Sequence, residues 1–147
     1  MKGLYDVKYN SIKPGQIWLD TNGERIQAHG GSIITVDDTF YWYGENKENT
    51  DGQNDNWHWG VKCYASKDLY NWEDKGIIIL PDTEDESSPL HPKQFMDRPH
   101  IIYNEKTKKV RMLAKDYEKR WNTSLYDFDG RSYFRVLYYR KKWSASA

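Results

Sequence analysis

The residues with the clearest potential for chemistry are polar side chains that adjoin aromatic or glycine-rich runs. Glu45 ends the run Phe40-Tyr-Trp-Tyr-Gly-Glu, Asp97 opens the run Asp-Arg-Pro-His, and Gln27 and His29 precede two consecutive glycines. Carboxylate, amide and imidazole groups all bond hydroxyl groups, and glycines let the backbone approach a ligand closely or adopt a positive φ. These segments are therefore the candidates for a binding or catalytic site.

Aromatic side chains are the outlier of the composition, with seven Trp and twelve Tyr among 147 residues. A chain rich in Trp and Tyr favours strands over helices. Aromatic faces also pack against the apolar C–H faces of sugar rings, although packing inside a β core would account for the same residues. The charge is balanced, with 22 basic and 22 acidic residues. No basic field is present to gather phosphates, which argues against nucleic acid as a partner.

The chain gives no sign of a disulfide, a metal, a cofactor or a membrane span. Cys63 stands alone in the sequence, so it has no intramolecular partner and implies no cysteine-based metal site. Residues 1–12 are polar and lack the apolar core of a secretion signal. No apolar run approaches the roughly 20 residues of a membrane helix. As written, the chain is expected to be cytoplasmic, or secreted if its true start lies upstream.

The first half of the chain reads as short strands separated by polar turns. Strands are predicted at residues 32–36, 40–43, 59–65 and 76–80, with an exposed loop at 45–56 and a turn at 66–72. Four short antiparallel strands in sequence form one propeller blade. After an acidic linker at 82–93, His100-Ile-Ile echoes Ser32-Ile-Ile at an offset of 68 residues. A repeat of this size predicts a second blade.

Three motifs carry a resemblance to a known family. They are Ile26-Gln-Ala-His-Gly-Gly-Ser-Ile-Ile34 running on to Tyr41-Trp-Tyr-Gly-Glu45, Tyr64-Ala-Ser-Lys-Asp-Leu-Tyr-Asn-Trp72, and Met96-Asp-Arg-Pro-His-Ile-Ile-Tyr-Asn104. Together they resemble glycoside hydrolase family 43, whose fold is a five-bladed β-propeller, and within it the galactan 1,3-β-galactosidase branch. The implied fold class is all-β, with about two blades of the propeller. Residues 1–110 would be the N-terminal part of the catalytic domain, followed by an irregular tail.

The resemblance implies an exo-acting hydrolase that cleaves β-1,3-galactan or a related β-galactoside with inversion. Inversion needs a protonated carboxyl group and a base about 6.5–9.5 Å apart. In the family the base comes from the first blade, a pKa-tuning carboxylate from the second and the acid from the third. Asp97 takes the place of the tuning carboxylate, which would raise the pKa of the acid by like-charge proximity. An ion pair with Arg98 is the alternative.

The other implied roles concern the base, the acid and the substrate. No carboxylate stands near Gly30, where the family usually has its base, so the base is unassigned and the general acid is expected to be absent from this chain. The residues expected to bind substrate are Gln27, His29, Tyr43 and Glu45. A structural histidine bonded to backbone is the alternative for His29, and a solvated loop acid is the alternative for Glu45.

The family pattern stops near residue 110, and the tail at 111–147 does not match it. Residues 1–114 carry 14 basic and 18 acidic residues, whereas residues 115–147 carry 8 and 4, so the net charge changes from −4 to +4. The predicted strand pattern fails at the same place. A reading-frame slip would explain this coincidence, and a divergent but genuinely encoded tail is the alternative.

The expected function of the chain itself follows from these points. A chain that lacks the third blade is expected to be weakly active or inactive, and its open sheet edges would favour self-association. Its expected partner is an oligo- or polysaccharide, without nucleic acid or membrane. The alternative is a non-catalytic carbohydrate-binding module that uses its Trp and Tyr side chains as a platform.

Overall fold

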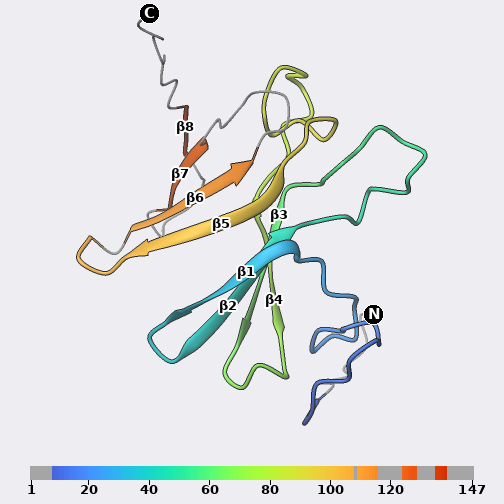
Figure 1. The fold of residues 1–147 in the computed structure, drawn as a ribbon, viewed down its shortest axis with the longest axis vertical. Coiled ribbons are helices and arrows are strands. Elements are labelled where there is room, and N and C mark those ends of the chain that lie inside the picture. Colours follow the sequence, from blue (N-terminus) through green and yellow to red (C-terminus); the bar gives the residue numbers. More distant parts are fainter. Residues whose placement is uncertain (1–7, 108, 116–123, 129–134, 139–147) are drawn as a thin grey trace, which may run out of the picture.

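The computed structural model describes residues 8–107, 109–115, 124–128 and 135–138, which form strands and turns (Figure 1). No helix that could cross a membrane occurs in these residues. The strands are β1 (His29–Val36), β2 (Thr39–Glu45), β3 (Val61–Ser66), β4 (Glu73–Ile79), β5 (Asp97–Asn104), β6 (Lys109–Lys115), β7 (Ser124–Phe128) and β8 (Arg135–Tyr138).

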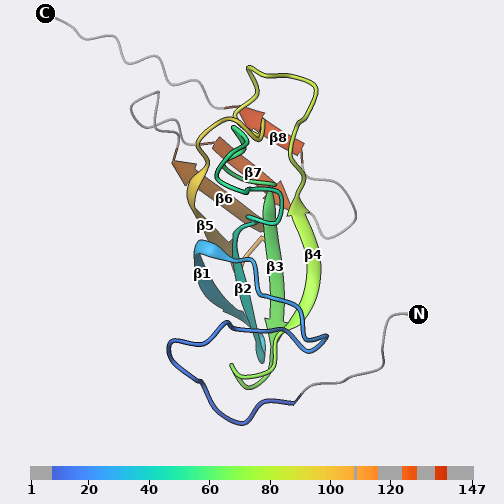
Figure 2. The same ribbon diagram turned by 90° about the vertical axis from the view of Figure 1, so that its right-hand side faces the viewer.

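The strands form two four-stranded antiparallel sheets, each in chain order. The first sheet is β1-β2-β3-β4 and the second is β5-β6-β7-β8. Figure 2 shows the strands of the first sheet side by side from β1 to β4. The first strands of the two sheets, β1 and β5, pack against each other. Two consecutive meanders that meet through their first strands have the arrangement of two neighbouring propeller blades. We call them blade 1 and blade 2.

The 68-residue repeat seen in the sequence is also a repeat of backbone geometry. Strand β1 begins at His29 and β5 begins at Asp97, and each has a bulge within its first four residues, before Ser32 and before His100. The second residue of both strands has a left-handed backbone, with φ of 57° at Gly30 and 51° at Arg98. Both blades therefore begin with the same kink, although only blade 1 uses a glycine for it.

The main core lies between the blades. Tyr43, Val61, Cys63 and Ile79 of blade 1 are buried against a group that precedes or belongs to blade 2, namely Leu90, Met96, Ile101 and Met112. The Tyr43 hydroxyl also accepts a hydrogen bond of 2.7 Å from the N–H of Ile101. Burial raises the pKa of the Cys63 thiol to about 12, so this cysteine is a core residue and not a nucleophile.

A second, aromatic cluster lies on the other face of blade 1. Tyr64 and Trp72 are fully buried there, with Trp42 packed against them. The rings of Trp18, Trp42 and Trp72 follow one another, with centroids 4.9 Å and 5.3 Å apart. Many of the aromatic residues that set this composition apart are thus core residues of a β-sheet, which was one of the two readings of the sequence.

The second sheet continues into the region for which the sequence predicted no strands. Strand β6 runs to Lys115, and β7 and β8 complete the four-stranded order. Both late strands are short runs with β-branched, leucine or aromatic residues, Ser-Leu-Tyr-Asp-Phe and Arg-Val-Leu-Tyr, which suit a strand locally. Residues 116–123, 129–134 and 139–147 lie outside the described residues. The domain boundary at residue 110 and the reading-frame slip stay predictions.

The hydrogen bond between Tyr43 and Ile101 generates a prediction about the joint between the blades. Tyr43→Phe removes the hydroxyl and leaves the buried N–H of Ile101 without its acceptor, which costs about 1–3 kcal/mol. Urea denaturation should show this loss. Tyr70→Phe is the matched control because Tyr70 is 37% exposed, and it should change the free energy of unfolding by less than about 0.5 kcal/mol. Equal losses in both variants would contradict the prediction.

Candidate functional site

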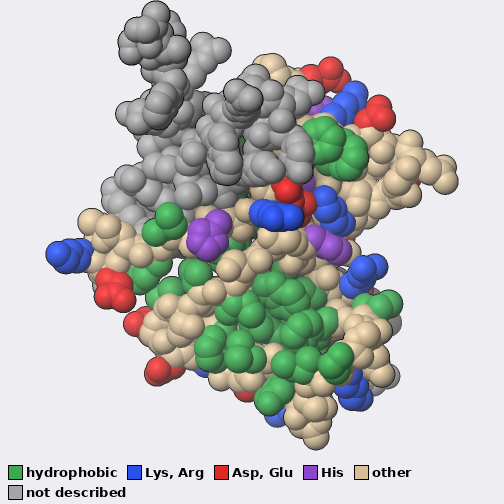
Figure 3. Space-filling model, viewed as in Figure 1, with side chains coloured by type: hydrophobic (Ala, Val, Ile, Leu, Met, Phe, Trp, Pro, Cys, Tyr) green, Lys and Arg blue, Asp and Glu red, His purple; other side chains and the backbone are tan. Residues whose placement is uncertain are grey.

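The predicted site residues come together where β1, β2 and β5 meet. His29, at the start of β1, is the register partner of Glu45, at the end of β2. The carboxylate of Glu45 in turn contacts the backbone of Arg98, next to Asp97 at the start of β5. Figure 3 shows acidic, basic and histidine side chains gathered at this junction of the two blades. Glu45 and Asp97 therefore lie on the same side of the molecule, as the sequence predicted.

Glu45 is the central group of the cluster. It is only 5% exposed, its Oε1 accepts a hydrogen bond of 3.0 Å from the Arg98 N–H, and its Oε2 lies 2.6 Å from Lys47 Nζ. A Cβ at Gly30 would lie 2.9 Å from Oε1. The glycine therefore makes room for the carboxylate. Glu45 is a buried, paired acid, so the alternative of a solvated loop acid does not hold.

Asp97 is more accessible and only loosely paired. Its side chain is 33% exposed, and its Oδ2 lies 3.6 Å from the Nε of Arg98, whose own side chain is 80% exposed. The ion pair considered as the alternative role is thus present. Exposed ion pairs of this kind contribute about 0–1 kcal/mol to stability. The pair with Arg98 is therefore too weak to define the role of Asp97.

The left-handed backbone of Arg98 is a local strain at the site. A residue other than glycine pays about 1–2 kcal/mol for this conformation, and φ at Arg98 is 51°. The bond from its N–H to Glu45 is one of the contacts that hold it there. Strain of this kind is typical of functional sites, and here it fixes the direction in which β5 begins and hence the position of Asp97.

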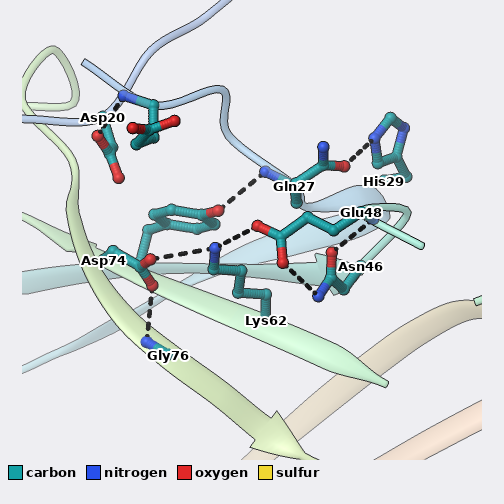
Figure 4. A network of polar contacts seen from close by, with 10 residues as sticks. Asp20, Gln27, His29, Asn46, Glu48, Lys62, Asp74 and Gly76 are labelled. Carbon is teal, nitrogen blue, oxygen red and sulfur yellow. Dashed lines mark hydrogen bonds and ion pairs between the residues drawn. The ribbon is translucent and has the colours of Figure 1, made fainter. Parts of the chain in front are cut away.

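Gln27 and His29 form a bonded pair beside Glu45. Gln27 is 9% exposed, its N–H donates to the Tyr64 hydroxyl at 2.9 Å, and its Oε1 lies 2.9 Å from His29 Nε2 (Figure 4). This bond places a proton on Nε2 and leaves Nδ1 as an acceptor in the neutral ring. Burial lowers the pKa of His29, the charges of Arg25 and Lys47 lower it further, and Glu45 opposes them. His29 is thus a neutral group that bonds the side chain of Gln27.

Tyr43 does not fit the role predicted for it. Its side chain has no exposed surface, and its hydroxyl accepts the hydrogen bond from Ile101. Tyr43 and Glu45 point to the same face of β2, but Tyr43 lies two residues further from the strand end and is covered by β5. Its position gives it no surface with which to contact a substrate. It joins the blades.

Sequence reasoning missed a charged network around Lys62, whose register partner on β2 is Gly44, the residue before Glu45. Lys62, 9% exposed, lies 2.7 Å from Glu48 Oε1 and 3.1 Å from Asp74 Oδ2 (Figure 4). Burial lowers the pKa of Lys62, but the bonds to these two carboxylates outweigh it and raise the pKa overall. The amide of Asn46 donates to Glu48 at 3.1 Å. The signal in the sequence was a lysine inside an otherwise uncharged strand, Val-Lys-Cys-Tyr-Ala-Ser.

The two long loops next to the cluster are joined to each other. The Trp57 N–H donates to the Pro92 carbonyl at 2.8 Å, and the rings of Trp57 and Phe95 are 4.3 Å apart. The segment at 82–93 was predicted to be a linker. Its residues 83–87 are exposed, whereas Ser88, Leu90 and His91 are buried, so only the second half of the segment is packed. Among the described residues, no three His, Cys, Asp or Glu side chains are grouped to hold a metal ion.

The chain is similar to several proteins of known structure. No family model matches the chain, and no curated protein matches it in sequence. Among solved structures, a GH43 β-1,3-galactosidase with galactodeoxynojirimycin is 31% identical, with a TM-score of 0.69 over 86% of this chain and 37% of that chain. An exo-β-1,3-galactanase from Phanerochaete chrysosporium with galactose is 30% identical, with a TM-score of 0.66 over 80% and 27%. An exo-β-1,3-galactanase from Clostridium thermocellum is 29% identical, with a TM-score of 0.69 over 88% and 27%.

These matches and the two blades define the chain as part of a β-propeller of the glycoside hydrolase class. In sequence and fold the chain is similar to part of these structures, which are β-1,3-galactosidases of glycoside hydrolase family 43 and exo-β-1,3-galactanases. It spans between about a quarter and two fifths of the length of these proteins. The family and the all-β propeller fold predicted from the sequence are thereby confirmed.

The bonds of Glu45 generate a prediction about stability. Glu45→Ala leaves the Arg98 N–H and Lys47 without their shared acceptor and should cost about 1–3 kcal/mol in urea denaturation. Glu45→Gln keeps an oxygen for the N–H and should cost less. Glu73→Ala is the control because the Lys75–Glu73 pair is exposed, and such pairs contribute about 0–1 kcal/mol. An equal effect of Glu45→Ala and Glu73→Ala would refute the central role of Glu45.

A buried histidine in the loop after β2 generates a prediction about pH. His58 is fully buried and its Nδ1 accepts from the Gly60 N–H at 3.0 Å. Burial, with a contribution from Lys47, lowers the pKa of His58 from 6.5 to about 4. The unfolded chain therefore binds this proton at a higher pH than the folded chain, and stability should fall as the pH drops from 6.5 toward 4.

The variant that tests this is His58→Asn, which keeps an acceptor for the Gly60 N–H and has no proton to bind. Urea denaturation at pH 7.5 and pH 5 should show a smaller loss of stability at the lower pH than in the unmodified chain. His100→Asn, at an exposed position, should leave the pH dependence unchanged. An unchanged pH dependence in His58→Asn would contradict the assignment.

Proposed function

We propose that the protein to which this chain belongs hydrolyses β-1,3-linked galactan from a chain end, with inversion at the cleaved bond. The observation that supports it is the cluster of His29, Glu45 and Asp97 at the ends of β1, β2 and β5, in a chain similar to family-43 galactanases. Inverting hydrolysis requires carboxyl groups around a water-sized gap, and the beginnings of neighbouring first strands supply such positions.

In this proposal Asp97 tunes the general acid. Its carboxylate is partly exposed and is held only by the weak pair with Arg98, so its charge is available to a neighbouring group. A nearby negative charge raises the pKa of a carboxyl group and keeps it protonated. The strained backbone at Arg98, held by Glu45, sets the position of that charge. The donor itself is expected on the third blade, beyond the two blades of this chain.

In this proposal the side chains of His29, Gln27 and Glu45 bind hydroxyl groups of the substrate. The Nδ1 of neutral His29 is an acceptor, and Gln27 holds the ring through Nε2. Glu45 already uses one oxygen for Arg98 and the other for Lys47, which suits a positioning group better than a base. No carboxylate stands at position 30, where the family usually has its base, and a side chain there would collide with Glu45. The base is therefore left unassigned.

The proposal predicts that the 147-residue chain releases no galactose from β-1,3-galactan above background. A general acid contributes about 10²–10⁴-fold, and this one is not expected among the two blades. A protein in which a one- or two-base change near codon 110 restores a longer frame should release galactose. Replacing the Glu at the mouth of its third blade with Gln should abolish the release and leave the melting curve unchanged.

Sequencing the gene around codons 105–150 and assaying both proteins distinguishes the alternatives. Galactose release by the 147-residue chain would show that the catalytic acid has been misplaced. Binding of galactan by the restored protein without any release would favour the carbohydrate-binding module. A tail that is in frame, with unrelated sequence downstream in every frame, would contradict the hypothesis of a reading-frame slip.

A further inference from the structure

We propose that Trp57 and Phe95 form an aromatic platform that holds a sugar ring of the substrate chain beside the polar cluster. The inference rests on the proposed function and adds a subsite to it. The two rings come from different loops, one between β2 and β3 and one before β5, and their centroids are 4.3 Å apart with an angle of 38° between planes. Trp57 is 49% exposed, so its outer face is open.

The platform is tied directly to the predicted site. Lys47 Nζ lies 2.6 Å from Glu45 Oε2 and also donates a hydrogen bond to the Trp57 carbonyl. One lysine thus joins the central carboxylate of the cluster to the backbone of the platform. In Figure 1, the loop between β2 and β3 extends from the end of blade 1 at which β1 begins. A ligand bound at His29 and Glu45 would therefore have this loop as its neighbour.

The indole of Trp57 is exposed, but the backbone of this residue is held by hydrogen bonds. The Trp57 N–H donates to the Pro92 carbonyl at 2.8 Å and its carbonyl accepts from Lys47. The next residue, His58, is fully buried, and the Trp59 N–H donates to the Asn46 carbonyl at 2.8 Å. A loop that is already held in place can present an aromatic face to a ligand without the entropy cost of ordering the loop on binding. Binding sites have this property.

The position of Trp57 differs from that of the other exposed tryptophan in the described residues. Trp18 is 37% exposed and packs on Trp42 over the aromatic cluster of blade 1, so it covers a core. Trp57 contacts Phe95 across two loops instead. A flat, uncharged aromatic surface fits the apolar C–H face of a neutral pyranose ring, and the nearby polar groups fit its hydroxyls. Together with the proposed function, this surface points to a neutral β-linked galactose oligomer as the ligand.

The test compares two variants that both keep an apolar side chain at position 57. Trp57→Phe keeps a flat ring, whereas Trp57→Leu keeps apolar bulk without one. Binding of β-1,3-galactotriose to the 147-residue chain is measured by NMR titration, after melting curves have shown that the variants are folded. Trp57→Leu should weaken binding by about tenfold or more, equivalent to about 1.4 kcal/mol, and Trp57→Phe by much less. Tyr70→Leu, at another exposed aromatic residue, should bind like the unmodified chain.

The outcomes separate this inference from the proposed function. If the unmodified chain binds galactotriose and Trp57→Leu binds it equally well, the platform is wrong and the proposed function stands. If Tyr70→Leu loses as much affinity as Trp57→Leu, the effect is not specific to the platform and the inference is also wrong. If the unmodified chain binds no galactotriose while the frame-restored protein cleaves galactan, the platform is wrong and the function stands. If neither protein binds or cleaves galactan, both fail.

Discussion

Blade 1 and blade 2 are held in register by two side chains of β2 that accept hydrogen bonds from the backbone of β5. The Tyr43 hydroxyl accepts a hydrogen bond from the N–H of Ile101 in the core. The Glu45 carboxylate accepts one from the N–H of Arg98 near the start of β5. Because β5 is the edge strand of its sheet, part of its N–H groups point away from β6 and have no acceptor within that sheet. Buried donors without acceptors cost stability, so the placement of Asp97 depends on what β2 offers.

This constraint explains why a core residue and a residue of the candidate site lie next to each other on one face of a short strand. On β2, Tyr43 belongs to the core and Glu45 to the site, although they share a face. The same division appears at Gly30 and Arg98, which hold equivalent backbone conformations in the two blades. In blade 1 the glycine leaves space for Glu45. In blade 2 the arginine provides the N–H that Glu45 binds, at the cost of a strained backbone.

Much of the fold could be predicted from local pattern. The four strands of blade 1, the turn at 66–72 and the 68-residue repeat all follow from alternation and turn residues. The same offset that aligns Ser32 with His100 also relates the first residues of β1 and β5, although the first strand was predicted to begin only at residue 32. The burial of Tyr43 could not be predicted, since it depends on how deep β5 covers β2. Likewise, the packing of Leu90 and His91 depends on a loop that lies more than thirty residues earlier in the chain. Strands β7 and β8 were missed because their runs are too short to stand out from a polar tail.

The row of indoles on the face of blade 1 opposite the main core gives the molecule an optical property. Trp18, Trp42 and Trp72 have centroids about 5 Å apart, with their planes inclined by 60° and 65°. Neighbouring indoles at such distances couple their excited states, so their circular dichroism and fluorescence depend on how the rings pack against one another. All three belong to blade 1 or to the segment before it. The optical signal of these three rings therefore reports on the packing of blade 1 and of the segment before it.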